Sequence, residues 1–484
     1  MAINGIGSGM DINGMVKALV NAESAPKTAQ LDRLEKTTTN KVSALGQFRS
    51  ALSTFQTALG KLNDSSLFEK RSATSSASDT VSIKADSSAA AGKYNVQVFN
   101  LAQTSKVALG GVDNATDKLG SGKMTISVGD NALDIDLTDA SLSDVRDAIN
   151  AAGKDSGLSA SIISDPSGGG GSRLVLSSNT SGTGNDIQVS VSGADADQLN
   201  QLAFAPPSGA DADFKPTAVD DSDPRAARVI SYSRDANIAI DGINMSSASN
   251  TVEGAIEGVT LTLNKAQSAD ALEKLETVSL GVTEDKGGVN KAITEFVDAY
   301  NAMMDTVNSL TNVTPIGGDD KEPLAAALVG DSSVRAFMTN IRNELSNTGN
   351  ATGIRLLSDL GVTTQRDGKL AIDDTKLSDA LDKNFEQVNA FFTGDQGLMA
   401  RMDSKVKPYT DTNGLLASRT KSLQNTISSV DKEREAHAAR VSKLEARLFS
   451  QFNAMDMLVS QLNGTSSFLT SQLDSLPGVV KQNK

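Results

Sequence analysis

Apolar residues near the start of the chain recur at alternating spacings of three and four, a pattern typical of helices that pair along one side. The pattern begins after Asp11, a predicted N-cap. Thr38 and Lys41 hold seam positions where an apolar residue is expected. We therefore expect long helices here, with the apolar positions Ile12, Met15, Val16, Leu19, Val20, Leu31, Leu34, Leu45, Phe48, Leu52, Phe55, Leu59 and Leu62.

The same heptad pattern returns near the end of the chain. Arg434, His437 and Gln451 are its polar exceptions, and Gly464 is predicted to bend the helix. Leu469 and Leu473 continue the apolar face beyond that glycine. The pattern predicts a C-terminal helical arm with one frame through Leu416, Leu423, Ile427, Val430, Val441, Leu444, Leu448, Met455, Leu458 and Leu462.

Between the arms the period changes to two, which indicates β-strands. Residues 72–79, "SATSSASD", are predicted to be a linker or turn, and residues 205–225 a mobile loop. A short helix capped by Ser141 interrupts the strands. Strands are expected at 80–86, 93–101, 105–111, 158–164, 172–178, 185–193, 228–233, 236–242 and 258–264, with a hairpin at 122–137 that turns near Gly129–Asn131.

A second helical region follows residue 287. We expect helices at 332–345 and 375–392, and between them a hairpin at 364–373 with Asp367 and Gly368 at its turn. Pro408 and Gly414 separate this region from the C-terminal arm. The first helix of the region has an uninterrupted heptad stripe formed by Val289, Ile293, Phe296, Tyr300, Met303, Val307 and Leu310.

The order of the elements predicts an α+β multidomain fold with helical arms at both ends, a helical region between them and a β-rich insertion. Burying one apolar seam residue contributes about 1.5–3 kcal/mol, whereas ordering the backbone costs about 1–2 kcal/mol per residue. A pair of arms then roughly breaks even, so we expect order when neighbouring subunits cover the remaining faces. This indicates an assembly protein, with a rigid intramolecular stalk as the alternative.

Composition narrows the function further. The formal charge of −14 argues against binding nucleic acid or an anionic membrane surface. There is no cysteine and no apolar run of membrane-span length. The first twenty residues have no basic region before an apolar core, so we do not expect them to be a secretory signal peptide. The chain is therefore expected to be cytosolic, or to be secreted by a route that does not use a cleaved signal peptide.

Catalytic and metal-binding motifs are weak. The sole histidine, His437, lies in a heptad seam, where a bundle role is far more common than catalysis. The glycine-rich stretch 165–174 lacks the lysine of a phosphate loop, and 134–139 lacks the glycine and glutamate of a calcium loop. The aspartates of the 205–225 loop favour a solvated surface over a loose cation site. We expect no enzyme activity, no cofactor and no metal.

Several segments together resemble one family, the bacterial flagellar filament-capping proteins (FliD, hook-associated protein 2). The opening carries Ser8, Gly9, Met10 and Asp11 before an amphipathic helix and Pro26. Residues 447–473 are similar to the family's C-terminal helix, and 122–178 to a module inserted in flagellin-like proteins. A further family element is matched by Leu360, Gly361, Val362, Asp367, Gly368, Lys369, Leu370 and Asp373.

The resemblance implies a domain plan. Residues 1–44 with 416–484 would form a terminal helical coiled-coil leg, partly disordered in the monomer. Residues 45–76 with 284–415 would form the helical middle domain. Residues 77–118 with 228–283 would form an inner β head domain, and 119–227 an outer one.

The resemblance also implies a function. Five or six subunits would form a ring at the distal tip of the extracellular flagellar filament, retain exported flagellin and promote its folding and insertion. Hook–filament junction proteins would be further partners. Type III export would carry the chain out, and a cytosolic chaperone would first shield the C-terminal helix. The alternative is an adhesin whose head domains bind host mucin or glycans.

The residues expected to bind partners lie on the arms. Those that the resemblance assigns to the chaperone are Leu444, Leu448, Phe452, Met455 and Leu458. The complete set is Ile12, Met15, Leu19, Leu45, Phe48, Leu52, Phe55, Leu59, Leu444, Leu448, Phe452, Met455, Leu458 and Leu462.

Overall fold

The chain folds into two compact units, each of which is described by itself. Unit 1 comprises Met1–Leu67 and Lys286–Lys484, and unit 2 comprises Phe68–Asp285. The computed structural model describes residues 9–154, 156–167, 169–195, 198–207, 216–220, 222–314, 324–348 and 353–475. The α+β multidomain class predicted from the sequence is confirmed, whereas the four domain boundaries stay a prediction.

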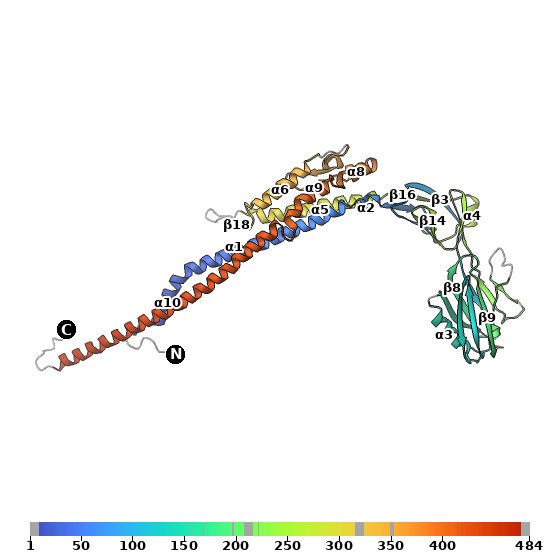
Figure 1. Cartoon of the computed structure of the whole chain (residues 1–484), viewed down its shortest axis with the longest axis horizontal. Coiled ribbons are helices and arrows are strands. Elements are labelled where there is room, and N and C mark those ends of the chain that lie inside the picture. The colour runs from blue at the N-terminus through green and yellow to red at the C-terminus, as the bar shows by residue number, and fades with distance from the viewer. Residues whose placement is uncertain are drawn as a thin grey trace. The chain divides into compact units, whose positions relative to one another are not determined.

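Unit 1 is built on two long helices, α1 (Ile12–Leu62) and α10 (Leu415–Asp474), which run side by side (Figure 1). We call the second half of α1 and the elements packed on it the helical block. Its remaining elements are α5 (Lys286–Thr311), α6 (Ser332–Leu345), α7 (Asp374–Lys383), α8 (Phe385–Phe392), α9 (Leu398–Thr410), the turn η2 (Leu357–Leu360), the hairpin β17 (Val313–Thr314) with β18 (Leu324–Ala325), and the hairpin β19 (Val362–Thr364) with β20 (Leu370–Ile372).

Several helical predictions can be checked against these bounds. The helix at 332–345 and the hairpin that turns at Asp367 and Gly368 are confirmed. The single helix at 375–392 is wrong, because Asn384 leaves helical geometry and separates α7 from α8. Helix α10 continues through Gly464 to Asp474, and the bend expected at this glycine stays a prediction.

Aromatic side chains form the centre of the helical block. Phe55 of α1 lies 6.0 Å from Phe296 and 5.9 Å from Tyr300 of α5, measured between ring centroids. Phe337 of α6 lies 5.6 Å from Phe48. The predicted α5 stripe from Val289 to Leu310 is buried throughout, so the heptad pattern here reports an intramolecular core.

An ion pair connects the start of α10 to α6. Asp331 caps α6 and accepts hydrogen bonds of 2.8 and 2.6 Å from the Arg419 guanidinium, which also contacts Ser333. The Arg419 hydrogen bonds hold the pKa of Asp331 below its usual 3.8. A lowered pKa means that this stabilisation is present above the unfolded-state pKa and is lost as pH falls through the folded-state pKa.

We therefore expect Arg419→Gln to lower the free energy of unfolding at neutral pH by about 1–3 kcal/mol, because it removes charge-assisted hydrogen bonds to a mostly buried carboxylate. It should also flatten the acid limb of the stability profile. Urea unfolding from neutral to acidic pH measures both effects. Lys383→Gln, which removes an exposed pair with Asp379, is the control and should change neither. An unchanged acid limb in Arg419→Gln would contradict the assignment.

Unit 2 contains two β cores. The first core combines a five-stranded sheet, ordered β1-β16-β3-β12-β13, with a three-stranded sheet, β14-β15-β2. Its strands are β1 (Arg71–Ser75), β2 (Val81–Ala85), β3 (Gly92–Asn100), β12 (Ala236–Ile240), β13 (Ile243–Ser247), β14 (Thr251–Ile256), β15 (Val259–Leu263) and β16 (Val278–Glu284). The short helix α2 (Ser65–Glu69) precedes these strands in the sequence, and α4 (Ala269–Glu273) lies between β15 and β16.

The second core packs helix α3 (Leu142–Ala152) with two further sheets, ordered β10-β11-β4-β8-β7 and β6-β5-β9. Ser141 caps α3 in a capping box, as predicted, and its hydrogen bonds lower the pKa of Asp144 to about 2. The strands are β4 (Thr104–Ala108), β5 (Ser121–Val128), β6 (Asn131–Leu137), β7 (Leu158–Ser164), β8 (Ser172–Ser181), β9 (Ile187–Asp195), β10 (Thr217–Ala218) and β11 (Arg228–Ser231), with the turn η1 (Leu199–Leu202).

The predicted strands of unit 2 are found, and the predicted turn after Val128 is confirmed. The linker expected at 72–79 is wrong in its first part, because β1 pairs there with β16 through backbone hydrogen bonds that need no apolar side chains. Within the 205–225 loop, β10 pairs with β11. The remainder of that prediction, at 208–215 and 221, lies outside the described residues.

Charge is divided unevenly between the units. Unit 2 carries 30 Asp and Glu against 16 Lys and Arg, whereas unit 1 carries 29 of each. The whole formal charge of −14 therefore belongs to unit 2.

Candidate assembly interface

The first part of α1 and the second part of α10 form an antiparallel pair that we call the leg. Ile12, Val16 and Val20 are buried against α10. The Asp11 carboxylate fixes the start of α1 by accepting a hydrogen bond of 2.9 Å from the Gly14 N–H. The half-buried side chains packed on this cluster are Met15, Val441, Leu444, Leu448, Phe449 and Phe452.

Ion pairs set the register of the leg. Lys27 pairs with Glu433 at 2.9 Å, and Arg434 contacts both Asp32 and Glu35 at 2.6 Å. All five side chains are more than a third exposed, so these pairs contribute little stability and serve mainly to align the helices.

The polar interruptions of the heptads have separate explanations. Thr38 is buried, and its hydroxyl donates to the Leu34 carbonyl at 2.7 Å, which satisfies it inside the seam. Lys41 is exposed. His437 lies between the helices, with Nε2 3.3 Å from the Ser24 carbonyl oxygen. A structural role for the histidine, as predicted, accounts for this contact.

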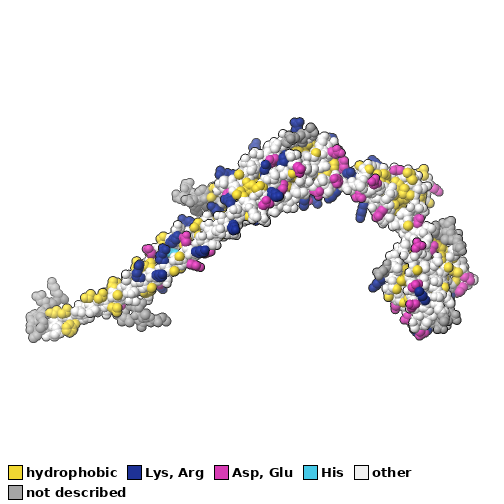
Figure 2. All heavy atoms as spheres, in the orientation of Figure 1, with side chains coloured by type: hydrophobic (Ala, Val, Ile, Leu, Met, Phe, Trp, Pro, Cys, Tyr) yellow, Lys and Arg dark blue, Asp and Glu magenta, His cyan; other side chains and the backbone are white. Residues whose placement is uncertain are grey.

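Beyond Phe452, α10 continues without α1 beside it. We call Met455–Asp474 the overhang; at 1.5 Å per residue it is about 30 Å long. Figure 2 shows hydrophobic side chains along this end of the leg. The exposed fractions of its large apolar side chains are 41% for Met455, 69% for Met457, 61% for Leu458, 67% for Leu462, 65% for Phe468, 54% for Leu469 and 59% for Leu473.

These side chains occupy two faces of the overhang. Successive helical residues turn by about 100°, which places Leu458, Leu462 and Leu469 on one face. Met457 and Phe468 share a second face, turned from the first by about 80–140°. A single helical partner covers one stripe, so burying both faces requires more than one neighbouring element.

The structure separates the fourteen predicted partner-binding residues into three groups. Leu45, Phe48, Leu52, Phe55 and Leu59 are at most 1% exposed in the helical block, so their own chain already covers them and they offer no surface to a partner. The residues in the intramolecular seam of the leg are Ile12, Met15, Leu444, Leu448 and Phe452. The exposed residues are Leu19, Met455, Leu458 and Leu462.

Sequence reasoning missed Met457 and Phe468, because they lie outside the heptad stripe. The signal that could have found them is large apolar residues at polar positions of a helix, in a segment whose only charged residues are Asp456 and Asp474.

Other kinds of site find little support in the described residues. Nowhere in the described ranges do three or more Asp, Glu or His side chains gather to hold a metal ion. Among the described helices, none combines the length and hydropathy that a membrane span requires. β7 and β8 pair as far as Ser164 and Ser172, so a strand and not a helix follows the glycine-rich stretch.

Comparisons with known proteins agree with the layout. Family models match residues 8–105 (Flagellar hook-associated protein 2 N-terminus), 233–464 (Flagellar hook-associated protein 2 C-terminus) and 123–180 (Flagellin hook IN motif). The A-type flagellar hook-associated protein 2 of Pseudomonas aeruginosa is 42% identical over 99% of both chains. The flagellar hook-associated protein 2 of Escherichia coli is 33% identical over 97% of both.

The fold has a solved counterpart. The crystal structure of the D1-D2-D3 domains of the E. coli flagellar cap protein FliD superposes with a TM-score of 0.60 at 32% identity, covering 79% of this chain and 99% of that one. With relatives of this identity over nearly the whole length, the chain belongs to the flagellar hook-associated protein 2 family.

Proposed function

We propose that this protein is the structural cap at the distal tip of the bacterial flagellar filament, and that it acts by assembly and not by catalysis. Membership of the hook-associated protein 2 family and the likeness to the E. coli flagellar cap protein support this role. The observation that carries it is the overhang, an apolar helix end that the described part of its own chain leaves uncovered.

The overhang explains why a cap must assemble. Each large apolar side chain contributes about 1.5–3 kcal/mol when it is fully buried. The two apolar faces favour an environment of several helices, such as neighbouring legs and the helices of subunits at the filament tip. The leg then anchors the protein at the filament tip.

The finer assignments rest on the same family. Five or six copies form a ring outside the cell, which retains exported flagellin and promotes its folding and insertion. Hook–filament junction proteins are further binding partners of the cap. Before export, a cytosolic chaperone covers the apolar face from Leu444 to Leu458, whose distal part is exposed in the described structure.

Complementation tests the cap role directly. In a bacterial strain whose own cap gene is deleted, the full chain should restore swimming and filament length and should reduce the flagellin lost to the medium. Electron microscopy of the purified protein should show closed rings. If the exported chain left flagellin loss unchanged, the cap role would be rejected; open chains or monomers at all concentrations would reject the ring.

The comparisons support the cap role and not the adhesin alternative. Binding of host mucin by the head stays a prediction, motivated by the loops of unit 2. Saturable mucin binding by the intact protein, lost when free glycan competes, would support it. Binding no greater than that of an unrelated acidic protein would remove it.

A further inference from the structure

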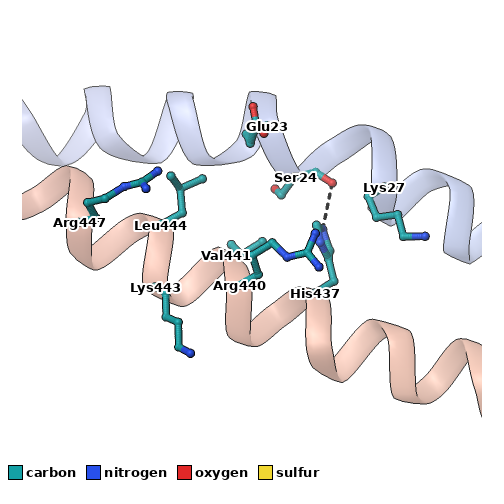
Figure 3. A pocket seen from close by; sticks show the side chains of 9 residues that line it. All are labelled: Glu23, Ser24, Lys27, His437, Arg440, Val441, Lys443, Leu444 and Arg447. Atoms are coloured by element: carbon teal, nitrogen blue, oxygen red, sulfur yellow. Dashed lines mark hydrogen bonds between the residues drawn. The ribbon is translucent and has the colours of Figure 1, made fainter.

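A groove opens between α1 and α10 near Pro26. Its volume is about 620 Å³, and its floor includes the half-buried Val441 and Leu444. Figure 3 shows Ser24 of α1 facing His437 of α10 at one end of this groove. The groove is continuous with the apolar seam of the leg, because Val441 and Leu444 also pack on the cluster around Val16.

The rim of the groove is strongly cationic. Arg440, Lys443 and Arg447 are exposed and lie at spacings of three and four on α10, which places them on one face beside the apolar floor. Lys27 lines the groove from α1, and among the described residues Glu23 is the only one in the lining that carries a carboxylate.

The cationic residues of the rim differ from others on the leg. Lys27 and Arg434 have carboxylate partners within the chain. In the parts of the chain that the structure describes, Arg440, Lys443 and Arg447 make no ion pair. Beside the apolar strip, these three cationic side chains therefore have no carboxylate partner among the described residues.

We propose that this groove docks an acidic amphipathic helix of a protein partner. The apolar side of that helix would lie on Val441 and Leu444, and its carboxylates, spaced by three and four residues, would face Arg440, Lys443 and Arg447. The apolar floor favours a protein helix over nucleic acid, because a phosphate backbone has no apolar side to bury.

A designed peptide tests the charge pattern on the full chain. The probe is a fluorescent amphipathic helix of about three heptads, with Leu on one face and Glu beside it. Fluorescence anisotropy should show saturable binding that weakens by about tenfold when Glu is replaced by Gln, and that weakens further at higher salt. Equal binding of both peptides would overturn the proposal.

Variants locate the binding to the groove. The triple variant Arg440→Glu, Lys443→Glu, Arg447→Glu should lose about tenfold or more in affinity for the acidic peptide. The control triple, Lys36→Glu, Lys41→Glu, Lys421→Glu, makes the same change in net charge at exposed positions elsewhere on α1 and α10 and should bind like the parent.

Three results would contradict the groove as the docking site. Equal losses in the two triple variants would show a non-specific charge effect. If neither triple variant lost affinity for the acidic peptide, the peptide would bind outside the groove. Tighter binding of single-stranded DNA than of the peptide at the same salt would assign the surface to nucleic acid. Circular dichroism checks that each variant stays helical. If a variant loses its helical structure, the proposal is judged on how the Glu and Gln peptides bind to the unaltered chain.

Discussion

A chain carrying Leu458→Ser and Leu462→Ser should fold as the parent does and fail to cap filaments. Both side chains are more than 60% exposed, so their replacement removes almost no intramolecular packing. The proposed assembly would bury the same residues, and losing two buried leucines would cost about 3–6 kcal/mol per subunit. Swimming in soft agar should fall to that of a strain without a cap, with flagellin in the medium.

The matched control is Gln461→Ser with Gln472→Ser, two exposed polar positions on the same overhang. It should swim normally. Thermal unfolding and circular dichroism of both purified variants should match the parent. Normal capping by the leucine variant would show that the overhang is not the anchoring surface, whereas a lowered melting temperature would show that it packs within the monomer.

Leu52→Ala is expected to produce a large loss of intrinsic stability. Leu52 is 0% exposed in the helical block, and truncating a buried leucine typically costs about 2–5 kcal/mol in free energy of unfolding. Leu34→Ala, the same substitution on the same helix, should cost less than about 1 kcal/mol, because Leu34 is 45% exposed.

Urea unfolding followed by helical circular dichroism measures both variants under conditions that keep the protein monomeric. Comparable losses at the two positions would mean that Leu34 is covered in solution. The pair of variants thus tests whether one heptad pattern contains both a buried core position and an exposed position on α1.

Periodicity was sufficient to predict most of the elements. The α5 stripe and the strands with alternating apolar residues were found because burial of one face imposes its period on the sequence. β1 was missed because its Ser- and Ala-rich sequence carries no such alternation, and its pairing with β16 depends on backbone groups. The break at Asn384 was missed because the apolar pattern continues across it, from Leu381 to Phe385 and Val388.

The candidate interface was only partly predictable. A heptad position reports that a residue faces a helix, but not which chain supplies that helix. Phe48 and Phe55 therefore looked like Leu458 and Leu462 in the sequence, although the first pair is buried and the second exposed. The distinction depends on where α1 begins relative to α10, which is a property of the fold.

The uneven division of charge has a consequence for how copies crowd together. Because unit 2 holds the entire surplus of negative charge, identical heads gathered at one tip repel each other. Counter-ions weaken that repulsion, while apolar contacts between legs persist in salt. Self-association should therefore strengthen as ionic strength rises, the reverse of an oligomer joined mainly by opposite charges. Buffers of low ionic strength would therefore favour the monomer, even though the proposed function requires self-association.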